Sequence, residues 1–225
     1  MPLPRAIWMF RYINHFAAMS SKVIQEQFGQ EIIDAMARFA KRDIKEPAAL
    51  QADEFSHVHD PALKTALAET LYGTRWLYKL GLALLANNVE QYAHVRAQII
   101  DYASIAEALL ADVIAQAYIK GKLTGGQYTL KYTRGSAPLV WNAADPGETV
   151  AYTTFEWRVK VAHESGIIDA LLSRQLNGIR TRRNTVHLTA KVMAGAVYYA
   201  GLAKRSHEAM HETIRQTKVW VAANP

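Results

Sequence analysis

The segment spanning residues 177–188 concentrates the side chains of this chain that are best suited to chemistry. Within eight residues it contains three arginines, an asparagine and a histidine: Arg180, Arg182, Arg183, Asn184 and His187. A guanidinium group can bind two oxygens of one phosphate, and an imidazole can accept or release a proton near neutral pH. Together these groups are suited to reactions of a phosphodiester bond.

Two local geometries would bring these side chains together. If Asn184 is the N-cap of a helix, Thr185 is the first helical residue and His187 lies in the first turn. Free backbone N–H groups and the positive end of the helix dipole would then attract an anion and favour a neutral imidazole. If the helix is instead unbroken, Arg180, Arg183, Asn184 and His187 are spaced i, i+3, i+4, i+7 and share one face. The sequence leaves both geometries open.

The hexapeptide Arg182-Arg183-Asn184-Thr185-Val186-His187 resembles the Arg-x(4–6)-His signature of the HEPN superfamily, whose small helical bundles include many metal-independent ribonucleases. Arg182 has the four-residue spacing to His187, and Arg180 has the six-residue spacing. The Arg183-Asn184 pair is one step closer to the histidine than in the commonest form of the motif, so the identity of the catalytic arginine stays open. The resemblance covers roughly residues 90–218.

The resemblance implies cleavage of RNA without a metal or another cofactor. It implies that His187 takes the proton of a ribose 2′-hydroxyl and that Arg182 binds the phosphate, assisted by Arg183 and Asn184. The product would carry a 2′,3′-cyclic phosphate. Four further residues are predicted to contact the substrate or face the motif: Arg180, Lys191, Glu107 and Ser104. The resemblance also implies a homodimer, and it associates the chain with bacterial toxins or antiviral defence and with a regulatory partner protein.

Two other functions compete with the ribonuclease. The first is a non-catalytic HEPN-like adaptor that binds nucleic acid or a partner protein through the same basic region. The second is a zinc hydrolase, because His207-Glu208-Ala209-Met210-His211 matches the His-Glu-x-x-His pattern. Only fourteen residues follow His211, and none after Glu212 is His, Asp or Glu. We therefore expect these two histidines to lie on a terminal helix that faces solvent.

Roles are predicted for three further groups of residues. The histidines and carboxylates of residues 53–60 are predicted to form a polar loop. Trp76 and Tyr78 fall within a helical pattern and are predicted to be in the core, whereas Tyr198 and Tyr199 lie in the basic region and could stack on bases.

The net charge of +6 arises from an excess of basic residues in one region of the chain. Residues 154–218 contain eleven Lys or Arg and five Asp or Glu, whereas the rest of the chain contains fifteen of each. Such a local basic excess favours an anionic partner, most commonly nucleic acid. There is no cysteine, which excludes disulfides, thiol nucleophiles, iron–sulfur clusters and cysteine-based zinc sites. No uncharged apolar run approaches the length of about 18 residues that a membrane span requires, so we expect a cytoplasmic protein without membrane contact.

The periodicity of apolar residues predicts an all-α protein. Asp60 is the expected N-cap of one helix, with Pro61 at its first position. The predicted helices cover 22–41, 61–87, 89–120, 154–164, 167–180 and 185–221, the last bent at Gly195 or Gly201. Turn residues dominate 123–152, where a short β-hairpin over 127–133 or an ordered loop is expected. We divide the chain into an N-terminal helical extension (1–88) and a HEPN-like helical domain (89–225) with an insertion at 123–152.

Overall fold

The structure is a computed structural model, and it describes residues 26, 29–123, 138–185 and 188–225. The helices of this described part follow one another as α2 (Gln30–Lys41), α3 (Pro47–Ala52), α4 (Pro61–Ala83), α5 (Asn88–Ile119), α6 (Pro146–Ala151), α7 (Phe155–Glu164), α8 (Ala170–Asn184), α9 (Leu188–Met193) and α10 (Ala200–Ala223). The described residues form no β-strand, so the all-α prediction is confirmed. In this part of the chain no helix is both long and apolar enough to cross a membrane.

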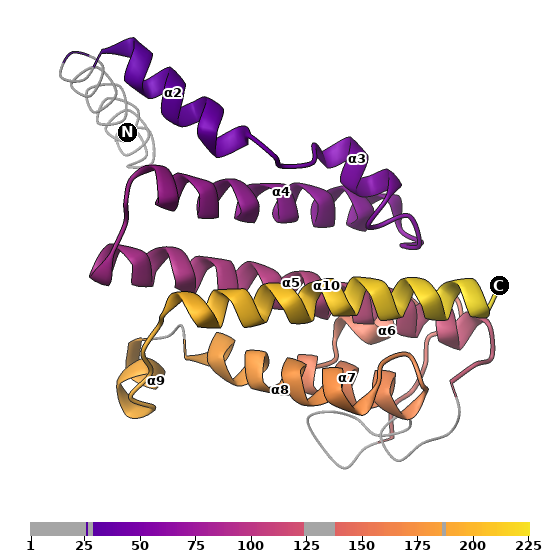
Figure 1. Ribbon diagram of the computed structural model, residues 1–225. Coiled ribbons are helices and arrows are strands. Elements are labelled where there is room, and N and C mark those ends of the chain that lie inside the picture. Colours follow the sequence, from indigo (N-terminus) through magenta and orange to yellow (C-terminus); the bar gives the residue numbers. More distant parts are fainter. Residues whose placement is uncertain (1–25, 27–28, 124–137, 186–187) are drawn as a thin grey trace, which may run out of the picture.

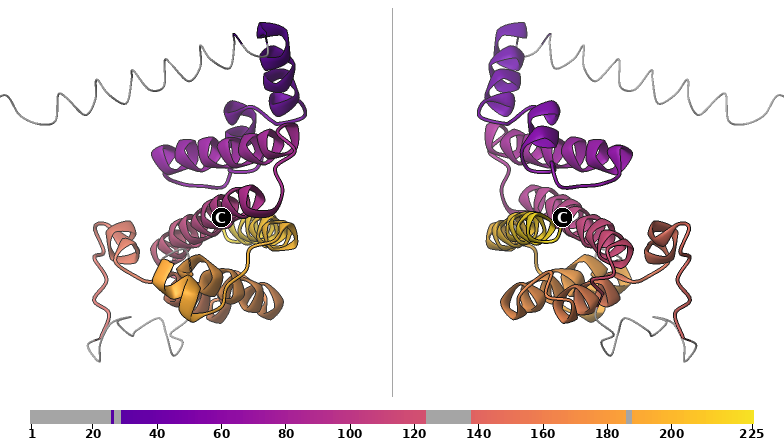
Figure 2. Two further views of the ribbon diagram at one scale, coloured as in Figure 1. Left: turned by 90° about the vertical axis from the view of Figure 1, so that its left-hand side faces the viewer. Right: turned by 90° about the vertical axis from the view of Figure 1, so that its right-hand side faces the viewer.

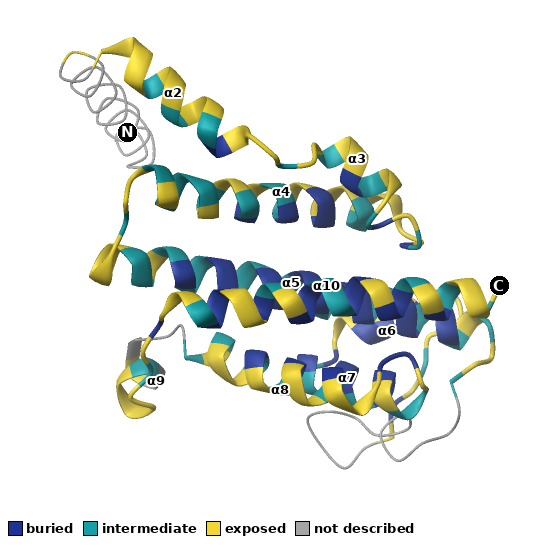
Figure 3. Cartoon of the chain, in the orientation of Figure 1, coloured by how far each residue is buried: buried dark blue, intermediate teal, exposed yellow. Residues whose placement is uncertain are grey.

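The helices form three layers (Figures 1 and 2). Helix α4, covered by α2 and α3, makes the first layer. The parallel pair α5 and α10 makes the central layer, and α7 and α8 lie on its other side. Figure 3 shows that burial is concentrated in the central layer, as expected for helices covered on two sides.

Helix α5 contributes to the core on most of its circumference. One face contributes residues to a cluster with α7 and α8: Ala103, Ala106, Leu110, Val113, Ile114 and Ala117. Another face packs with α3, α4 and α10 through Tyr102, Ile105 and Leu109. Burial of this apolar surface is the main force that holds the three layers together.

The boundary predicted after residue 88 coincides with the start of α5. Apolar side chains on both sides of this boundary nevertheless pack in one cluster. The cluster contains Leu50, Phe55, Val58, Leu67, Ala68 and Leu71 from the first part, and Tyr102, Ile105, Leu109, Met210 and Ile214 from the second. The division into two domains stays a prediction, but the two parts share a hydrophobic core.

The start of α4 is formed as its sequence predicted. The Asp60 carboxylate accepts a hydrogen bond of 2.9 Å from the backbone N–H of Ala62, and Pro61 occupies the first helical position. Proline is well suited to this position because the N–H that it lacks would have no helical partner there.

The prediction of one continuous final helix is wrong, because a break after α9 separates it from α10. Gly195 has a φ of 56°, and the N–H of Ala196 reaches back to the carbonyl of Lys191 at 3.0 Å. This hydrogen bond closes the end of a helix when the preceding residue is left-handed, a conformation that glycine adopts without a steric penalty. The glycine therefore ends the helix rather than bending it.

The region 123–152 contains a short helix that was not predicted. Helix α6 begins after Asp145, whose carboxylate accepts a hydrogen bond of 3.0 Å from the N–H of Glu148. The β-hairpin expected over 127–133 lies outside the described residues.

Candidate functional site

Helix α8 carries the arginines of the motif, and its start is attached to α10. The Asp169 carboxylate caps the helix by accepting a hydrogen bond of 2.7 Å from the N–H of Leu172. The Gln216 amide on α10 donates to the same carboxylate and accepts from the backbone N–H of Asp169, both at 2.8 Å. The face of α8 that carries Leu172, Leu176 and Ile179 is buried. The other faces of α8 are not buried by these contacts and carry its polar side chains.

The end of α8 differs from both predicted geometries. Asn184 is its last residue and Thr185 its C-cap, so the prediction that Asn184 caps the next helix is wrong, as is that of an unbroken helix. The Thr185 hydroxyl donates to the carbonyl of Arg182 at 2.7 Å, and the buried Tyr198 hydroxyl donates to the carbonyl of Thr185 at 2.9 Å. These hydroxyl groups bind carbonyl oxygens that a continuing helix would have used.

The motif therefore lies at the negative, C-terminal end of a helix dipole and not at the positive, N-terminal end that was expected. The arginines lie in the last turn of α8, where the free carbonyl groups carry a partial negative charge that favours cations. His187 itself lies outside the described residues. Its neighbours in sequence are the end of α8 at Asn184 and the start of α9 at Leu188.

Arg183 points toward α5 and forms a close ion pair. Its Nη1 donates a hydrogen bond of 2.6 Å to Oε2 of Glu107, whose side chain is only 17% exposed. A second guanidinium, that of Arg158, lies 3.8 Å from the same carboxylate. Arg158 is buried and also donates to the carbonyl oxygens of Val150 and Thr153, so this cluster has a structural role. Burial lowers the pKa of Arg158.

Arg180 is paired with a different carboxylate. Its Nη1 lies 3.2 Å from Oε2 of Glu156 on α7, and Lys160 binds the other oxygen of Glu156 at 2.7 Å. The hydrogen bond from Lys160, with the charge of Arg180, lowers the pKa of Glu156. Arg180 therefore serves to hold α8 against α7.

Arg182 is exposed and has no ion pair with any residue that the structure describes. It lines a groove of about 220 Å³ between α8 and α10, together with Arg174 and Arg205. Glu208 is the single acidic residue of this lining, and Ser206 contributes a hydroxyl group. Three guanidinium groups around one groove form a surface suited to a phosphate chain.

Sequence analysis missed Arg174 and Arg205 as partners of Arg182. One signal was present for the first, because Arg174, Gly178 and Arg182 are spaced by four residues and so lie on one helix face. No comparable signal existed for Arg205, which belongs to α10 and reaches the groove only through tertiary packing.

The remaining predicted residues are not gathered around Arg182. The Ser104 hydroxyl donates to the carbonyl of Ile100 within α5 at 2.8 Å. Lys191 on α9 places its ammonium group 5.8 Å from the ring centroid of Tyr198. Because Tyr198 is only 2% exposed, its ring is unavailable to stack on a base. Tyr199 is exposed, and its hydroxyl accepts a hydrogen bond of 2.5 Å from Arg205.

The prediction that His207 and His211 lie on a solvated terminal helix is wrong. Helix α10 belongs to the central layer, and the two ring Nε2 atoms lie 3.0 Å apart on its half-buried side. Burial lowers the pKa of His207 to about 4 and also lowers that of His211.

The prediction that Trp76 and Tyr78 belong to the core is wrong as well, because on α4 the first is 36% and the second 40% exposed. In the loop before α4, His57 is half-buried and its Nε2 lies 2.9 Å from the Thr217 hydroxyl. No cluster of three or more metal-ligating side chains is found among the described residues.

Comparison of the chain with protein-family models, with curated proteins and with solved structures finds no match.

Proposed function

We propose that this protein is a metal-independent endoribonuclease that binds RNA along the basic groove between α8 and α10. The observation that carries the proposal is the contrast among the three motif arginines. Arg180 and Arg183 are neutralised by Glu156 and Glu107, whereas Arg182 is exposed beside Arg174 and Arg205. A guanidinium that forms no ion pair with a described residue can bind a phosphate without first breaking an existing salt bridge.

The motif residues then have separate roles. Arg182 binds the scissile phosphate, and Arg174 and Arg205 bind neighbouring phosphates in the groove. Arg183 acts as a positioning residue, because its ion pair with Glu107 fixes the last turn of α8 against α5. Asn184, exposed at the end of the same turn, is available to bind a ribose or phosphate oxygen.

The proposed reaction needs one proton acceptor and one group that stabilises negative charge. His187 accepts the proton of a ribose 2′-hydroxyl, and the resulting oxygen attacks the adjacent phosphorus. The bond from phosphorus to the 5′-oxygen breaks, and this oxygen takes a proton from water to leave as a 5′-hydroxyl, while His187 returns the proton that it accepted to the solvent. Arg182 stabilises the charge on the phosphoryl oxygens during the attack, and the other product is a 2′,3′-cyclic phosphate.

The proposal includes a symmetric homodimer and a cytoplasmic location, both of which follow from the resemblance and the composition. Sedimentation equilibrium measures the first directly. If the protein is monomeric at all concentrations, the dimer is refuted, but the proposed roles of Arg182 and His187 are not affected.

The deciding experiment measures cleavage of a labelled single-stranded RNA in excess EDTA. We expect a 2′,3′-cyclic phosphate product from the wild-type protein and no cleavage of the all-deoxy strand. His187→Ala should lower the rate by about 10²–10⁴-fold, the usual contribution of a general base, while circular dichroism stays unchanged. Arg215→Ala, which changes an exposed arginine paired with Glu212, is the matched control and should cleave normally.

The same experiment identifies the alternative function. The protein would be a non-catalytic adaptor if it yields no product but still binds the RNA. Its binding should then depend strongly on salt and should be weakened by Arg182→Ala. Cleavage that persists in a folded His187→Ala variant would refute the proposed mechanism.

A further inference from the structure

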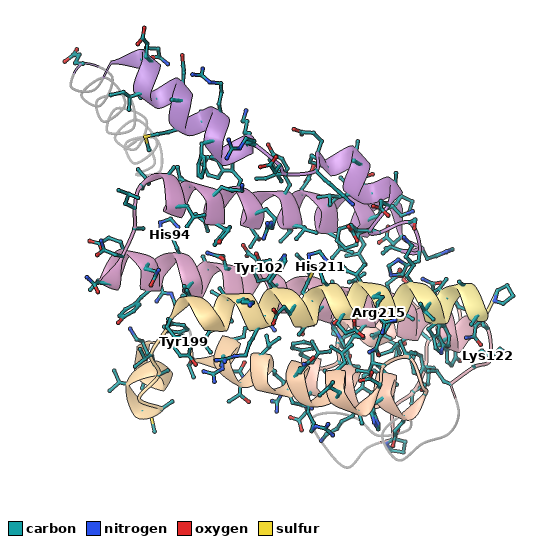
Figure 4. All side chains as sticks on the ribbon, viewed as in Figure 1. His94, Tyr102, Lys122, Tyr199, His211 and Arg215 are labelled. Carbon is teal, nitrogen blue, oxygen red and sulfur yellow. The ribbon has the colours of Figure 1, made fainter. Side chains whose placement is uncertain are left out.

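A second and larger cavity lies on the opposite side of α10, between that helix, α4 and α5. Its volume is about 410 Å³, within the range of about 300–1,000 Å³ that is common for small-molecule sites. Each of the three helices contributes residues spaced by three or four, so each helix turns one face toward the cavity. Figure 4 shows His94 and Tyr102, two of its lining residues, between α4 and the central layer.

The two ends of the cavity differ in polarity. One end is formed by Arg75, Tyr102 and His207, and the other by Leu82, Ala86 and Ala200 near the turn between α4 and α5. This order follows from the antiparallel course of α4 and α5 and the parallel course of α5 and α10 (Figure 1). A molecule in the cavity would therefore meet polar groups at one end and aliphatic groups at the other.

The polar end carries the positive charge of Arg75, which no carboxylate of the described residues balances. The lining residues include Arg75 and Lys204 but no Asp or Glu, and the Lys204 ammonium lies 3.8 Å from a carboxylate oxygen of Glu208 outside the lining. Arg75 is half-buried and forms no ion pair with any of the residues that the structure describes. A guanidinium in this position favours an anion, because burial of an uncompensated charge is costly.

The contact between Arg75 and His207 leaves N–H donors of the Arg75 guanidinium available. Nη1 of Arg75 lies 3.4 Å from Nε2 of His207, and the ring of Tyr102 meets the His207 ring edge-on at 5.2 Å. The guanidinium of Arg75 also lies 5.5 Å from the centroid of the Tyr78 ring and hydrogen-bonds to the Tyr102 side chain. Since a guanidinium has five N–H groups, these contacts still leave donors for the oxygens of a ligand.

Two further polar groups of the wall have no partner. Gln98 is only 4% exposed, and its amide forms no hydrogen bond with any described residue. Nδ1 of His94 is buried and likewise without a hydrogen-bond partner. Buried polar groups are normally hydrogen-bonded, so Nδ1 of His94 indicates a place where a bound molecule would supply the bond. The Gln98 amide lines the same wall and is available to the same molecule.

We propose that this cavity is a binding site for a small organic anion, with its carboxylate or phosphate on Arg75 and its apolar body against Leu82, Ala86 and Ala200. Gln98 and His94 hydrogen-bond to polar atoms along the ligand. This site is separate from the groove of Arg182, and the proposal does not depend on the ribonuclease function.

The binding test uses a pair of probes that differ in charge. 8-Anilinonaphthalene-1-sulfonate is an apolar anion, and N-phenyl-1-naphthylamine is its uncharged analogue. We expect the anion to bind the folded full-length protein at one site, and the neutral probe to bind at least tenfold more weakly. Decanoate and decyl phosphate, added as competitors, determine whether the site prefers a carboxylate or a phosphate.

Variants of the wall locate the bound probe. Arg75→Met should weaken binding of the anion about 10–100-fold, the usual effect of losing a hydrogen bond to a charged group, and should leave binding of the neutral probe unchanged. Gly81→Leu should block both probes, because a Cβ at Gly81 already lies 3.3 Å from the His94 ring. Gly73→Leu is the matched control on the same helix, since a Cβ there meets open space.

Binding is compared only among variants whose helical content and melting temperature match those of the controls, so that a loss of binding does not reflect a loss of folding. Equal binding of the anion to wild type and Arg75→Met, or undiminished binding to Gly81→Leu, would overturn the proposal. Failure of the anionic probe to bind the wild-type protein would overturn it as well. Ring-proton shifts of His94 and His207 on addition of the probe provide a second readout in the wild-type protein.

Discussion

Arg182 and Arg183 are neighbours in sequence but lie in opposite environments. Successive residues of a helix point about 100° apart, so Arg183 faces Glu107 on α5 whereas Arg182 faces the groove beside α10. The first is tied to a mostly buried carboxylate, and the second is exposed. Substitution of Arg183 should therefore affect mainly the stability of the protein, whereas substitution of Arg182 should affect mainly its capacity to bind an anion.

Arg182→Ala and Arg183→Ala should have different effects. Loss of Arg182 should leave the free energy of unfolding within about 0.5 kcal/mol of wild type, as is usual for an exposed side chain, and should weaken RNA binding. Loss of Arg183 should cost about 1–3 kcal/mol, because it removes a charged hydrogen-bond partner from Glu107. Urea denaturation and a filter-binding assay measure the two quantities. Equal destabilisation by both changes would contradict the assigned environments.

Two half-buried imidazoles should make the stability of the protein depend on pH. Burial lowers the pKa of His57 and that of His207 from 6.5 to about 4. Between these values the unfolded chain binds more protons than the folded one, so stability should fall as the pH decreases from about 6.5 to 4. Each histidine should contribute on the order of 1 kcal/mol, after allowance for its partial exposure to solvent.

Urea denaturation at pH 7 and at pH 5 measures this dependence. His57→Gln and His207→Gln should each reduce the loss of stability between the two pH values, whatever their stability at pH 7. A double variant that loses as much stability as wild type would show that other groups are responsible.

At the scale of elements, the connection between α7 and α8 depends on one left-handed residue. Gly166 has a φ of 66°, and the N–H of Ile167 that follows it donates to the carbonyl of Ala162 at 2.8 Å. This turn ends α7 and directs the chain to Asp169, the N-cap of α8. The position of the motif arginines therefore depends on a turn that lies more than a dozen residues before them.

Gly166→Ala should destabilise the protein by about 1–2 kcal/mol, because an alanine in the left-handed region brings its Cβ close to a carbonyl oxygen. Gly73→Ala, in the exposed middle of α4, should instead stabilise it by about 0.5–1 kcal/mol, since Gly73 is helical and its Cβ would meet nothing. Thermal denaturation compares the two variants. A melting temperature that is unchanged or raised in Gly166→Ala would contradict the role of this turn.

At the scale of the whole molecule, the central helices α5 and α10 join the layers on their two sides. Phe55, from the loop before α4, is fully buried in the cluster that also contains Leu109 and Met210. The first layer is thus packed on the same helices that support α7 and α8. We expect the described helices to unfold as one cooperative unit.

Phe55→Ala should therefore lower the stability of the whole helical structure by about 3–5 kcal/mol, the usual cost of truncating a buried phenylalanine. Far-UV circular dichroism and tryptophan fluorescence should report one coincident transition at a lower urea concentration. Ile32→Ala, at a side chain that is 50% exposed, is the control and should have little effect. Two separate transitions, the second at the wild-type midpoint, would show that the layers are independent.

The sequence by itself determined the features that depend on neighbouring residues. Helical periodicity predicted the all-α class, and the cap of Asp60 on α4 follows from a side chain that bonds to its own backbone. The break after α9 also has a local cause in Gly195, yet it was missed because a glycine inside a helical pattern can either bend or end the helix.

Only the tertiary structure decided which of these side chains are available for chemistry. Arg183 and Glu107 are separated by 76 residues, and His207 is half-buried because α4 covers that side of α10. Apolar burial is non-directional, so the pattern of one helix shows that a face is covered but not which helix covers it. The free guanidinium of Arg182 and the uncompensated charge of Arg75 result from how the three layers pack together.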